Sequence, residues 1–325
     1  MMSKKFTGPL FLVGMPRSGT KLLRALLNEH PLIEITKFET EFFPYWVKKW
    51  SSFGDLSDFN NFIAFYNNVT KSLYFFYYCK LNNNVIDPKK WFESCLDYSP
   101  AGVFEALVRH NTNVPFGSDK IWGDKSPSYI RYLPLLKRNF PKAKIIHIIR
   151  DVRDYCLSIN KAWGKNMIRA AQRWVDDITK ARNDAKEFLE DYLEVRYEDL
   201  LDSPEQELRR ICNFIGIEFC KDMLKLSEAP ESIGDAKGVK TIVNFNKEKY
   251  KYFMNRKTRR IIESIAKDLL QIYGYPVNND IQPYRVPKIK MFFYKLTDGF
   301  NLIKTEISKR GFIDAIKLTI AALRH

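Results

Sequence analysis

Closely spaced metal ligands are missing from this chain. Its 325 residues include only five cysteines, with no Cys-x-x-Cys pair, and four scattered histidines. Zinc sites draw on clustered Cys and His, so we expect no metal site. Cysteines that are few and scattered indicate free thiols in a reducing compartment.

Long apolar runs are missing as well. A membrane-spanning helix needs about 20 consecutive apolar residues, and no segment of the sequence approaches that length. The apolar run near the N-terminus is short and continues into a glycine turn, unlike a secretory signal. We therefore predict a cytoplasmic protein, with peripheral contact to a membrane left open.

Acidic side chains are in the minority. Lys and Arg number 53 against 38 Asp and Glu, which gives a formal net charge of +15. This charge favours an anionic partner, such as a nucleotide, a sulfated or phosphorylated substrate, a nucleic acid or an acidic membrane, without choosing among them. Hydrophobic residues make up 45% of the chain and aromatic residues 14%, which indicates a folded protein.

Short apolar runs predict buried parallel strands. Pro9–Val13 ends at a glycine and precedes Ser18–Asn28, whose leucines recur at helical spacing. Lys144–Ile149 is a second run, followed by a helix at Asp151–Trp163, and Leu193–Tyr197 is expected to be a third strand. Strand, glycine loop and helix in this order open a nucleotide-binding domain. We predict an α/β, P-loop-like three-layer fold with a central parallel sheet flanked by helices.

Aromatic residues are concentrated between Phe42 and Arg109, without the alternation of strands. We predict that they belong to a helical cap at about residues 42–118, inserted in a domain of residues 1–285. Their side chains are expected either to form core or to line an acceptor pocket.

The composition changes after Pro287. Residues 286–325 mix apolar residues with lysine and predict a basic amphipathic extension of two helices, broken at Gly311. Peripheral contact with a membrane and packing against the domain or a second subunit are both compatible with this pattern.

A phosphate-binding loop is the first chemical signal, at Gly14–Lys21. A glycine turn between a strand and a helix exposes backbone N–H groups, and the helix N-terminus adds partial positive charge. Ser18 and Thr20 supply hydroxyl donors, and Arg17 supplies a planar fork of donors.

The loop departs from the Walker A motif of kinases and NTPases. Gly14 and Gly19 have the Walker A spacing, but Thr20 and Lys21 follow in reverse order. The hydroxyl that would bind magnesium after the lysine is replaced by Leu22. A P-loop kinase or NTPase-like phosphotransferase therefore stays only as an alternative.

The segment PLFLVGMPRSGTKLLRALLNEHP resembles the 5′-phosphosulfate loop of sulfotransferases that use 3′-phosphoadenosine-5′-phosphosulfate (PAPS). Its Pro-Arg-Ser-Gly-Thr form is similar to that of bacterial members and tyrosylprotein sulfotransferases, with Lys21 where threonine is frequent. The resemblance implies PAPS as co-substrate, the desulfated product PAP, no metal, and a donor site that includes Arg17, Ser18, Gly19, Thr20 and Lys21.

A second anion site is needed for the 3′-phosphate of PAPS. In KIIHIIRDVRDYCLSI, Arg150 stands at the end of a strand and Ser158 lies about two turns along the next helix. The resemblance implies that these two residues bind the 3′-phosphate. Taken alone, the Arg-Asp-x-Arg-Asp run is equally compatible with helix capping and surface ion pairs.

Two later residues complete the implied donor site. RYEDLLDSPEQELRRICNFIGIEF resembles the family segment in which a tyrosine contacts the adenine, which points to Tyr197, although a core tyrosine is a close alternative. The family also has a basic loop over the nucleotide. Lys237–Lys240 is the candidate segment, with Lys240 preferred.

Sulfuryl transfer requires a base for the acceptor proton and a cation for the transferring group. The resemblance to the tyrosylprotein enzymes implies Glu39 as the base, with Glu41 and His110 as alternatives, and we expect His110 in a loop. His147, within an apolar strand, is interpreted as core. Trp122–Pro127 resembles a lysine-bearing turn of the family, so Lys125 is assigned to the sulfuryl group, with a surface lysine as the alternative.

These residues predict a sulfotransferase that acts by in-line displacement with a carboxylate base. The acceptor is a hydroxyl or amine of unknown identity, on a carbohydrate, a lipid, a peptide or a small metabolite. No nucleic acid partner is expected, and the oligomeric state is open. A non-catalytic nucleotide- or membrane-binding protein is a further alternative.

Overall fold

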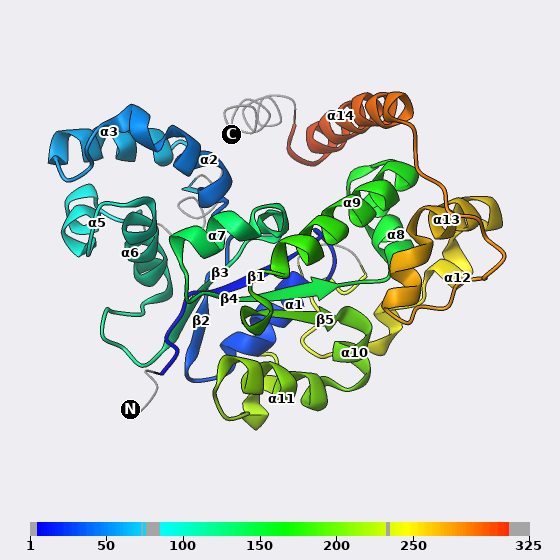
Figure 1. Cartoon of the computed structure of the whole chain (residues 1–325), viewed down its shortest axis with the longest axis horizontal. Coiled ribbons are helices and arrows are strands. Elements are labelled where there is room, and N and C mark those ends of the chain that lie inside the picture. The colour runs from blue at the N-terminus through cyan, green and yellow to red at the C-terminus, as the bar shows by residue number, and fades with distance from the viewer. Residues whose placement is uncertain (1–4, 73, 76–84, 232–234, 312–325) are drawn as a thin grey trace.

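A five-stranded parallel sheet forms the centre of the protein in our computed structural model (Figure 1), which describes residues 5–72, 74–75, 85–231 and 235–311. The strand order is β2-β3-β1-β4-β5. The strands are β1 (Leu10–Gly14), β2 (Ile33–Ile35), β3 (Ile121–Lys125), β4 (Lys144–Ile149) and β5 (Tyr192–Arg196). All four neighbouring pairs are parallel, as the buried apolar runs predicted.

Helices cover both faces of this sheet (Figure 1). Leu10 and Leu12 of β1 point to one face and belong to a core cluster with three helices, whereas Phe11 and Val13 point to the other face. The first face carries α1 (Thr20–Asn28), α10 (Tyr197–Asp202) and α11 (Pro204–Ile215). The second carries α7 (Leu133–Asn139), α8 (Val152–Trp163), α9 (Met167–Ala185) and α13 (Arg256–Ile272). The predicted three-layer α/β fold is therefore confirmed.

Strand β3 corrects the sequence interpretation of Trp122–Pro127 as a turn. Ile121–Lys125 pairs with β2 on one side and with β1 on the other, in the register Leu12 to Lys125. A Cβ on Gly123 would overlap the carbonyl oxygen of Leu10, so glycine is what lets the two strands approach. The strand was not predicted from the sequence because it ends in the charged residues Asp124 and Lys125, whereas buried parallel strands are normally apolar throughout.

The predicted cap region is helical and dominated by buried aromatic side chains. Its helices are α2 (Phe42–Lys49), α3 (Phe59–Val69), α5 (Pro88–Ser94) and α6 (Pro100–Thr112), with a 3-10 turn at Trp50–Phe53. Phe42, Phe43, Phe65, Trp91 and Phe104 are fully or almost fully buried and belong to the same core cluster as β1. These rings therefore form core rather than an acceptor pocket. Phe76, Tyr77 and Tyr78 lie outside the described residues.

The C-terminal part begins after α13. Helix α14 (Lys288–Arg310) ends at Gly311, as predicted for the first helix of the extension, and the second predicted helix falls in residues 312–325, outside the described part. None of the described helices has the length and apolarity needed to span a membrane. The remaining short elements are α12 (Tyr250–Phe253) and 3-10 turns at Pro127–Arg131, Leu189–Asp191, Lys221–Leu224 and Asn244–Asn246. The domain limits at residues 42–118 and 285 stay predictions.

Candidate active site

The loop between β1 and α1 is folded tightly against Tyr197. Arg17 and Gly19 both have left-handed backbones, with φ angles of 72° and 97°. A Cβ on Gly19 would overlap the Tyr197 ring, so the ring packs directly on the loop. Ser18 and Thr20 are buried, and the Ser18 hydroxyl has no hydrogen-bond partner among the described residues.

Arg150 lies beside this loop at the end of β4. Its Nη1 donates a hydrogen bond to the backbone oxygen of Arg17 at 3.1 Å, and its Nη2 donates to the backbone oxygen of Asn246 at 2.6 Å. The guanidinium stands over the Tyr197 ring, 4.7 Å from its centroid. Its Nε is buried and unpaired within the described part of the chain. Tyr197, predicted in a strand, is instead the first residue of α10.

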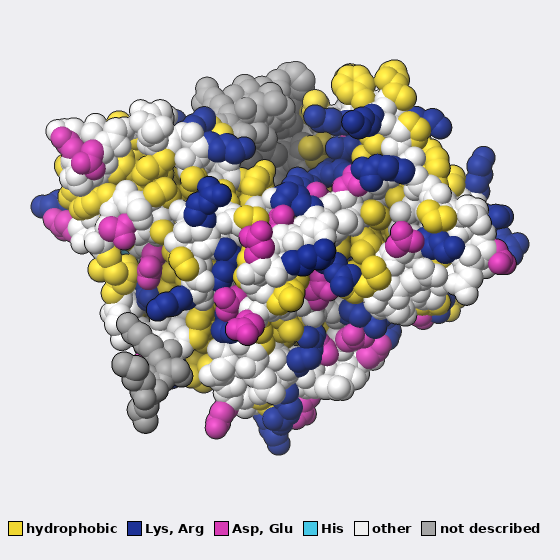
Figure 2. Space-filling model, in the orientation of Figure 1, with side chains coloured by type: hydrophobic (Ala, Val, Ile, Leu, Met, Phe, Trp, Pro, Cys, Tyr) yellow, Lys and Arg dark blue, Asp and Glu magenta, His cyan; other side chains and the backbone are white. Residues whose placement is uncertain are grey.

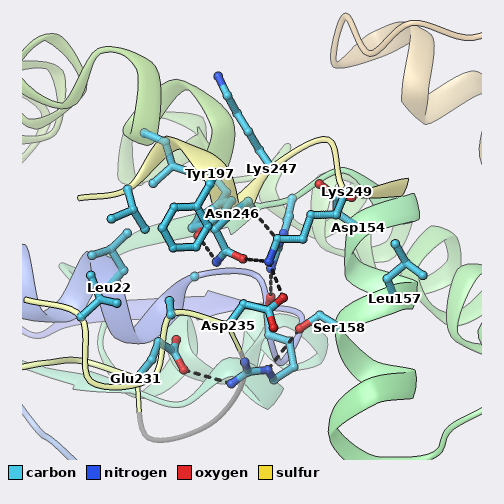
Figure 3. Close-up of a pocket in the computed structure, with 18 of the residues that line it drawn as sticks. Leu22, Asp154, Leu157, Ser158, Tyr197, Glu231, Asp235, Asn246, Lys247 and Lys249 are labelled. Atoms are coloured by element: carbon cyan, nitrogen blue, oxygen red, sulfur yellow. Dashed lines mark hydrogen bonds and ion pairs between the residues drawn. The ribbon is translucent and has the colours of Figure 1, made fainter. Parts of the chain in front are cut away.

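Arg17 joins the loop to helix α8. Its Nε donates to the hydroxyl of Ser158 at 3.4 Å, and its Nη1 forms an ion pair with Glu231 at 3.0 Å (Figure 3). The two anion sites predicted from distant parts of the sequence are thus brought to one place.

These residues line a single cavity of about 1,040 Å³, a volume suited to a nucleotide. The predicted donor-site residues in its wall are Arg17, Gly19, Arg150, Ser158 and Tyr197. Lys237 also lines it, whereas the preferred Lys240 is exposed and does not. Lys21 does not line the cavity. Burial lowers the pKa of its ammonium group, and the charges of Glu231, Lys125 and Glu39 also act on that pKa.

The segment before α12 contributes residues that sequence reasoning missed. Asn246 donates from Nδ2 to the Tyr197 hydroxyl at 2.7 Å, and Lys249 forms an ion pair with Asp235 at 2.5 Å (Figure 3). Lys161 of α8 pairs with the same carboxylate at 2.5 Å. The only signal for this wall in the sequence is the basic run NKEKYK at Asn246–Lys251.

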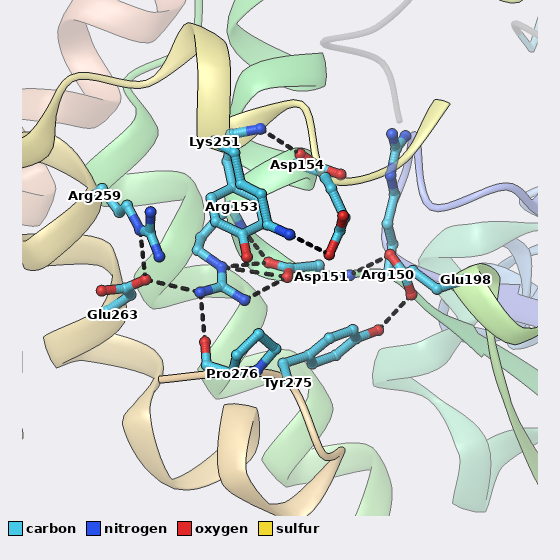
Figure 4. A network of polar contacts seen from close by, with 12 residues as sticks. Arg150, Asp151, Arg153, Asp154, Glu198, Lys251, Arg259, Glu263, Tyr275 and Pro276 are labelled. Carbon is cyan, nitrogen blue, oxygen red and sulfur yellow. Dashed lines mark hydrogen bonds and ion pairs between the residues drawn. The ribbon is translucent and has the colours of Figure 1, made fainter. Parts of the chain in front are cut away.

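A network of buried charges fixes the start of α8 behind Arg150 (Figure 4). Arg153 is fully buried and donates to both oxygens of Asp151, to Glu263 at 2.7 Å and to the backbone oxygen of Pro276 at 2.7 Å. Glu198 accepts from the Asp151 backbone N–H at 3.1 Å, and burial raises the pKa of Glu198 to about 7. Asp151 also caps α8 by accepting the Arg153 backbone N–H at 2.8 Å, so the capping alternative is confirmed. The ion pairs of the run are buried rather than on the surface, and Arg150 lines the cavity.

Lys125 and Glu39 form a second cluster of predicted site residues. The Lys125 ammonium lies 2.7 Å from Glu39 Oε1, and the lysine side chain is 1% exposed against 41% for the glutamate. Lys125 ends β3 and is not a surface lysine. This pair joins the two residues predicted as base and sulfuryl ligand, 86 positions apart in the sequence.

Asp124 holds the segment that carries Glu39. It accepts hydrogen bonds from the hydroxyls of Thr36 at 2.7 Å and Thr40 at 3.0 Å, and Thr40 also meets the Tyr129 hydroxyl at 2.9 Å. Burial raises the pKa of Asp124 to about 6. The loop after β2 is thus tied to β3 on both sides of Glu39.

The alternative bases occupy different places. Glu41 precedes α2 with a φ of 46°, and burial, followed by the neighbouring Glu39, raises its pKa. The prediction that His110 lies in a loop is wrong, because it is within α6, where burial and Lys90 lower its pKa. His147 is fully buried in β4 and its pKa falls to about 3, which confirms its interpretation as core.

The cavity is suited to an anionic nucleotide. Buried polar atoms are normally hydrogen-bonded, and within the described part of the chain Arg150 Nε in the cavity wall and the nearby Ser18 hydroxyl have no partner, so both can donate to an oxyanion. No group of three or more Cys, His, Asp or Glu able to hold a metal occurs among the described residues.

A parallel sheet with a glycine loop after β1 and a cavity lined by Arg17 and Arg150 defines a P-loop-like α/β fold. The sequence profile of the sulfotransferase family matches residues 9–221, more than half of the chain. The chain belongs to the sulfotransferase family.

Relatives and solved structures agree with this membership. A Caenorhabditis briggsae protein provisionally named a protein-tyrosine sulfotransferase is 25% identical over 302 residues, covering 87% of this chain and 94% of the relative. The sulfotransferase domain of the Synechococcus PCC 7002 olefin synthase has a similar fold, with a TM-score of 0.53, 21% identity, and coverage of 85% of this chain and 98% of that domain. The sulfotransferase domain of the curacin biosynthetic pathway gives a TM-score of 0.52 at 21% identity, covering 85% of this chain and 100% of that one.

Proposed function

We propose that the protein transfers a sulfuryl group from PAPS to a hydroxyl or amine of an acceptor and releases PAP. One observation carries this proposal: Arg17 and Arg150 reach the same cavity from the β1–α1 loop and from the end of β4, and Ser158 and Tyr197 line it with them. Two cations supplied to one cavity by separate elements suit a nucleotide that carries phosphate on both the 5′ and the 3′ position of its ribose.

The donor site follows from this arrangement. Arg17, with the backbone and hydroxyls of Ser18, Gly19 and Thr20, binds the 5′-phosphosulfate at the N-terminus of α1. Lys21, next along that helix, adds positive charge near the phosphate.

The other end of the donor lies at β4 and α8. Arg150 and Ser158 bind the 3′-phosphate, and the adenine lies against the Tyr197 ring. Lys237 or Lys240 contributes positive charge from the loop that follows Glu231. In this assignment Lys237 is the better placed of the two, because it lines the cavity.

The chemical step is an in-line displacement at sulfur. The acceptor oxygen or nitrogen attacks the sulfur, the bond from sulfur to the 5′-phosphate oxygen breaks, and PAP leaves with the electron pair. Glu39 accepts the acceptor proton, and Lys125 stabilises the charge on the transferring group and the bridging oxygen. The ion pair holds the carboxylate and the ammonium 2.7 Å apart, so that both groups can act on one reacting centre.

For the acceptor we propose the tyrosylprotein-like subgroup, so that a peptide tyrosine is the first candidate. The support is the Pro-Arg-Ser-Gly-Thr loop together with the Caenorhabditis briggsae relative, which aligns over nearly its whole length. Carbohydrates, lipids and small metabolites are the other candidate acceptors. The cytoplasmic location stays a prediction from the cysteine pattern.

The test is transfer of label from ³⁵S-PAPS to a panel of tyrosine peptides, carbohydrates, lipids and cell extract. We expect a labelled product that requires the intact chain and is lost in Arg17→Ala. A protein that raises its melting temperature with Mg-ATP and not with PAP would instead indicate the kinase alternative.

A further inference from the structure

Helix α14 carries an apolar stripe that faces solvent. Its members are 43% to 73% exposed, and at 100° per residue they fall on one side of the helix. The stripe consists of Ile289, Phe292, Phe293, Leu296, Phe300 and Ile303. Figure 2 shows hydrophobic side chains standing out from this part of the surface, with Lys and Arg side chains around them.

The opposite side of α14 attaches the helix to the protein through apolar and polar contacts, and its Met291 and Tyr294 pack against the hydrophobic core. Asp298 is buried, accepts the backbone N–H of Asn166 at 2.7 Å and forms an ion pair with Arg169 at 2.7 Å. Asn301 donates to the backbone oxygen of Gly164 at 2.9 Å. Because these contacts all lie on the side away from the stripe, the stripe is not needed for packing against the domain.

Exposed lysines border the stripe on both sides. Lys290 and Lys304 follow one edge, and Lys288 and Lys295 follow the other, each exposed. Long lysine stems lie along apolar surface while their ammonium groups reach outward, which is the arrangement of a helix lying in a membrane interface.

A second feature adds positive charge beside the helix. A cavity of about 410 Å³ opens between α9, α13 and the start of α14, and Arg260 and Lys290 line it together with Ile261 and Tyr294. A cavity lined by both cationic and apolar side chains suits the phosphate and the upper acyl chain of an anionic lipid.

We propose that α14 lies in the surface of an anionic membrane, with its stripe buried among the lipid chains and its lysines at the phosphates. The charge argues for lipid rather than a second copy of the chain, because two copies would bring these lysines together. At 23 residues, the helix would lie along about 34 Å of the surface.

The experiment is co-sedimentation of the full chain with phosphatidylserine–phosphatidylcholine vesicles and with phosphatidylcholine alone. We expect binding to the anionic vesicles, weakened at high salt, and lowered at least about tenfold in the double variant Phe293→Ser/Phe300→Ser. The matched control is Leu96→Ser/Leu189→Ser, two leucines that are 72% and 66% exposed on other elements. Melting temperature and PAP affinity, measured on every variant, identify misfolding and separate this result from the donor site.

Unchanged vesicle binding in Phe293→Ser/Phe300→Ser, or equal loss in the control, would overturn the proposal. So would a dimer in sedimentation analysis that the stripe variant abolishes, with no affinity for vesicles of either composition. That last outcome would make the stripe an interface between copies.

Discussion

Removal of the Lys125 ammonium is the sharpest test of the proposed chemistry. In Lys125→Met the volume of the side chain is nearly kept, so the fully buried site stays filled. The partner Glu39 is 41% exposed and is hydrated by solvent once the lysine is gone, so no buried unpaired charge remains. The loss of stability should therefore be small.

The expected effect on turnover is large. A cation that acts only on charge developing in the transition state contributes about 10²- to 10³-fold to kcat. Lys125 lies beside Glu39 and not in the wall of the donor cavity, so PAP affinity should change by less than about threefold.

Three measurements check this prediction: kcat at saturating PAPS, PAP affinity by calorimetry, and melting temperature. Lys120→Met is the control for loss of a lysine–glutamate pair, because Lys120 pairs with Glu34 at 2.9 Å just before the same strand, although Lys120 is 41% exposed. A parallel fall of kcat and PAP affinity would make Lys125 a donor-binding residue. A kcat within about threefold of the wild type would refute its catalytic role.

Three further results are expected. Glu231→Gln removes the carboxylate that pairs with Arg17, so calorimetry should show PAP binding several-fold tighter, and unchanged or weaker binding would contradict this competition. Gly19→Ala forces a Cβ into the Tyr197 ring at a φ of 97°, so melting temperature and PAP affinity should both fall, whereas a fully stable variant would contradict the tight loop packing. Because burial raises the pKa of Glu198 from 4.5 to about 7, the folded state binds the proton more tightly, and stability should fall by up to about 3 kcal/mol as pH rises through this window. In Glu198→Gln the free energy of unfolding, measured by denaturant titration at several pH values, should depend less on pH. A pH dependence equal to that of the wild type would contradict this role of Glu198.

Two of the predicted strands, β1 and β4, were marked by nearly uninterrupted apolar runs. β1 and β4 were found because every residue of LFLVG and nearly all of KIIHII is buried. β2 has only three residues, and β3 ends in Asp124 and Lys125, so neither has the pattern of a buried strand. What makes β3 a strand is its pairing with β1, a tertiary effect that no local pattern carries.

The candidate site likewise contains residues that the sequence predicted and residues that it did not. Arg17, Arg150 and Ser158 lie in motifs with fixed spacing to a strand end, and the structure brings them together. Asn246 sits in an irregular segment, where no periodicity marks a residue that reaches back to Tyr197. The amphipathic character of α14 was predicted from the sequence, but which side meets the protein depends on contacts with other helices, such as the ion pair of Asp298 with Arg169.

The most direct test of the two-anion donor site is a comparison of PAP with 5′-AMP, which lacks the 3′-phosphate. Calorimetry should show that the wild type prefers PAP by about 100-fold, the contribution of charge-assisted hydrogen bonds to one phosphate. Arg150→Ala should reduce that preference to within about threefold, while Arg17→Ala weakens both ligands and keeps it. Equal affinity of the wild type for the two nucleotides, or an undiminished preference in Arg150→Ala, would contradict the account.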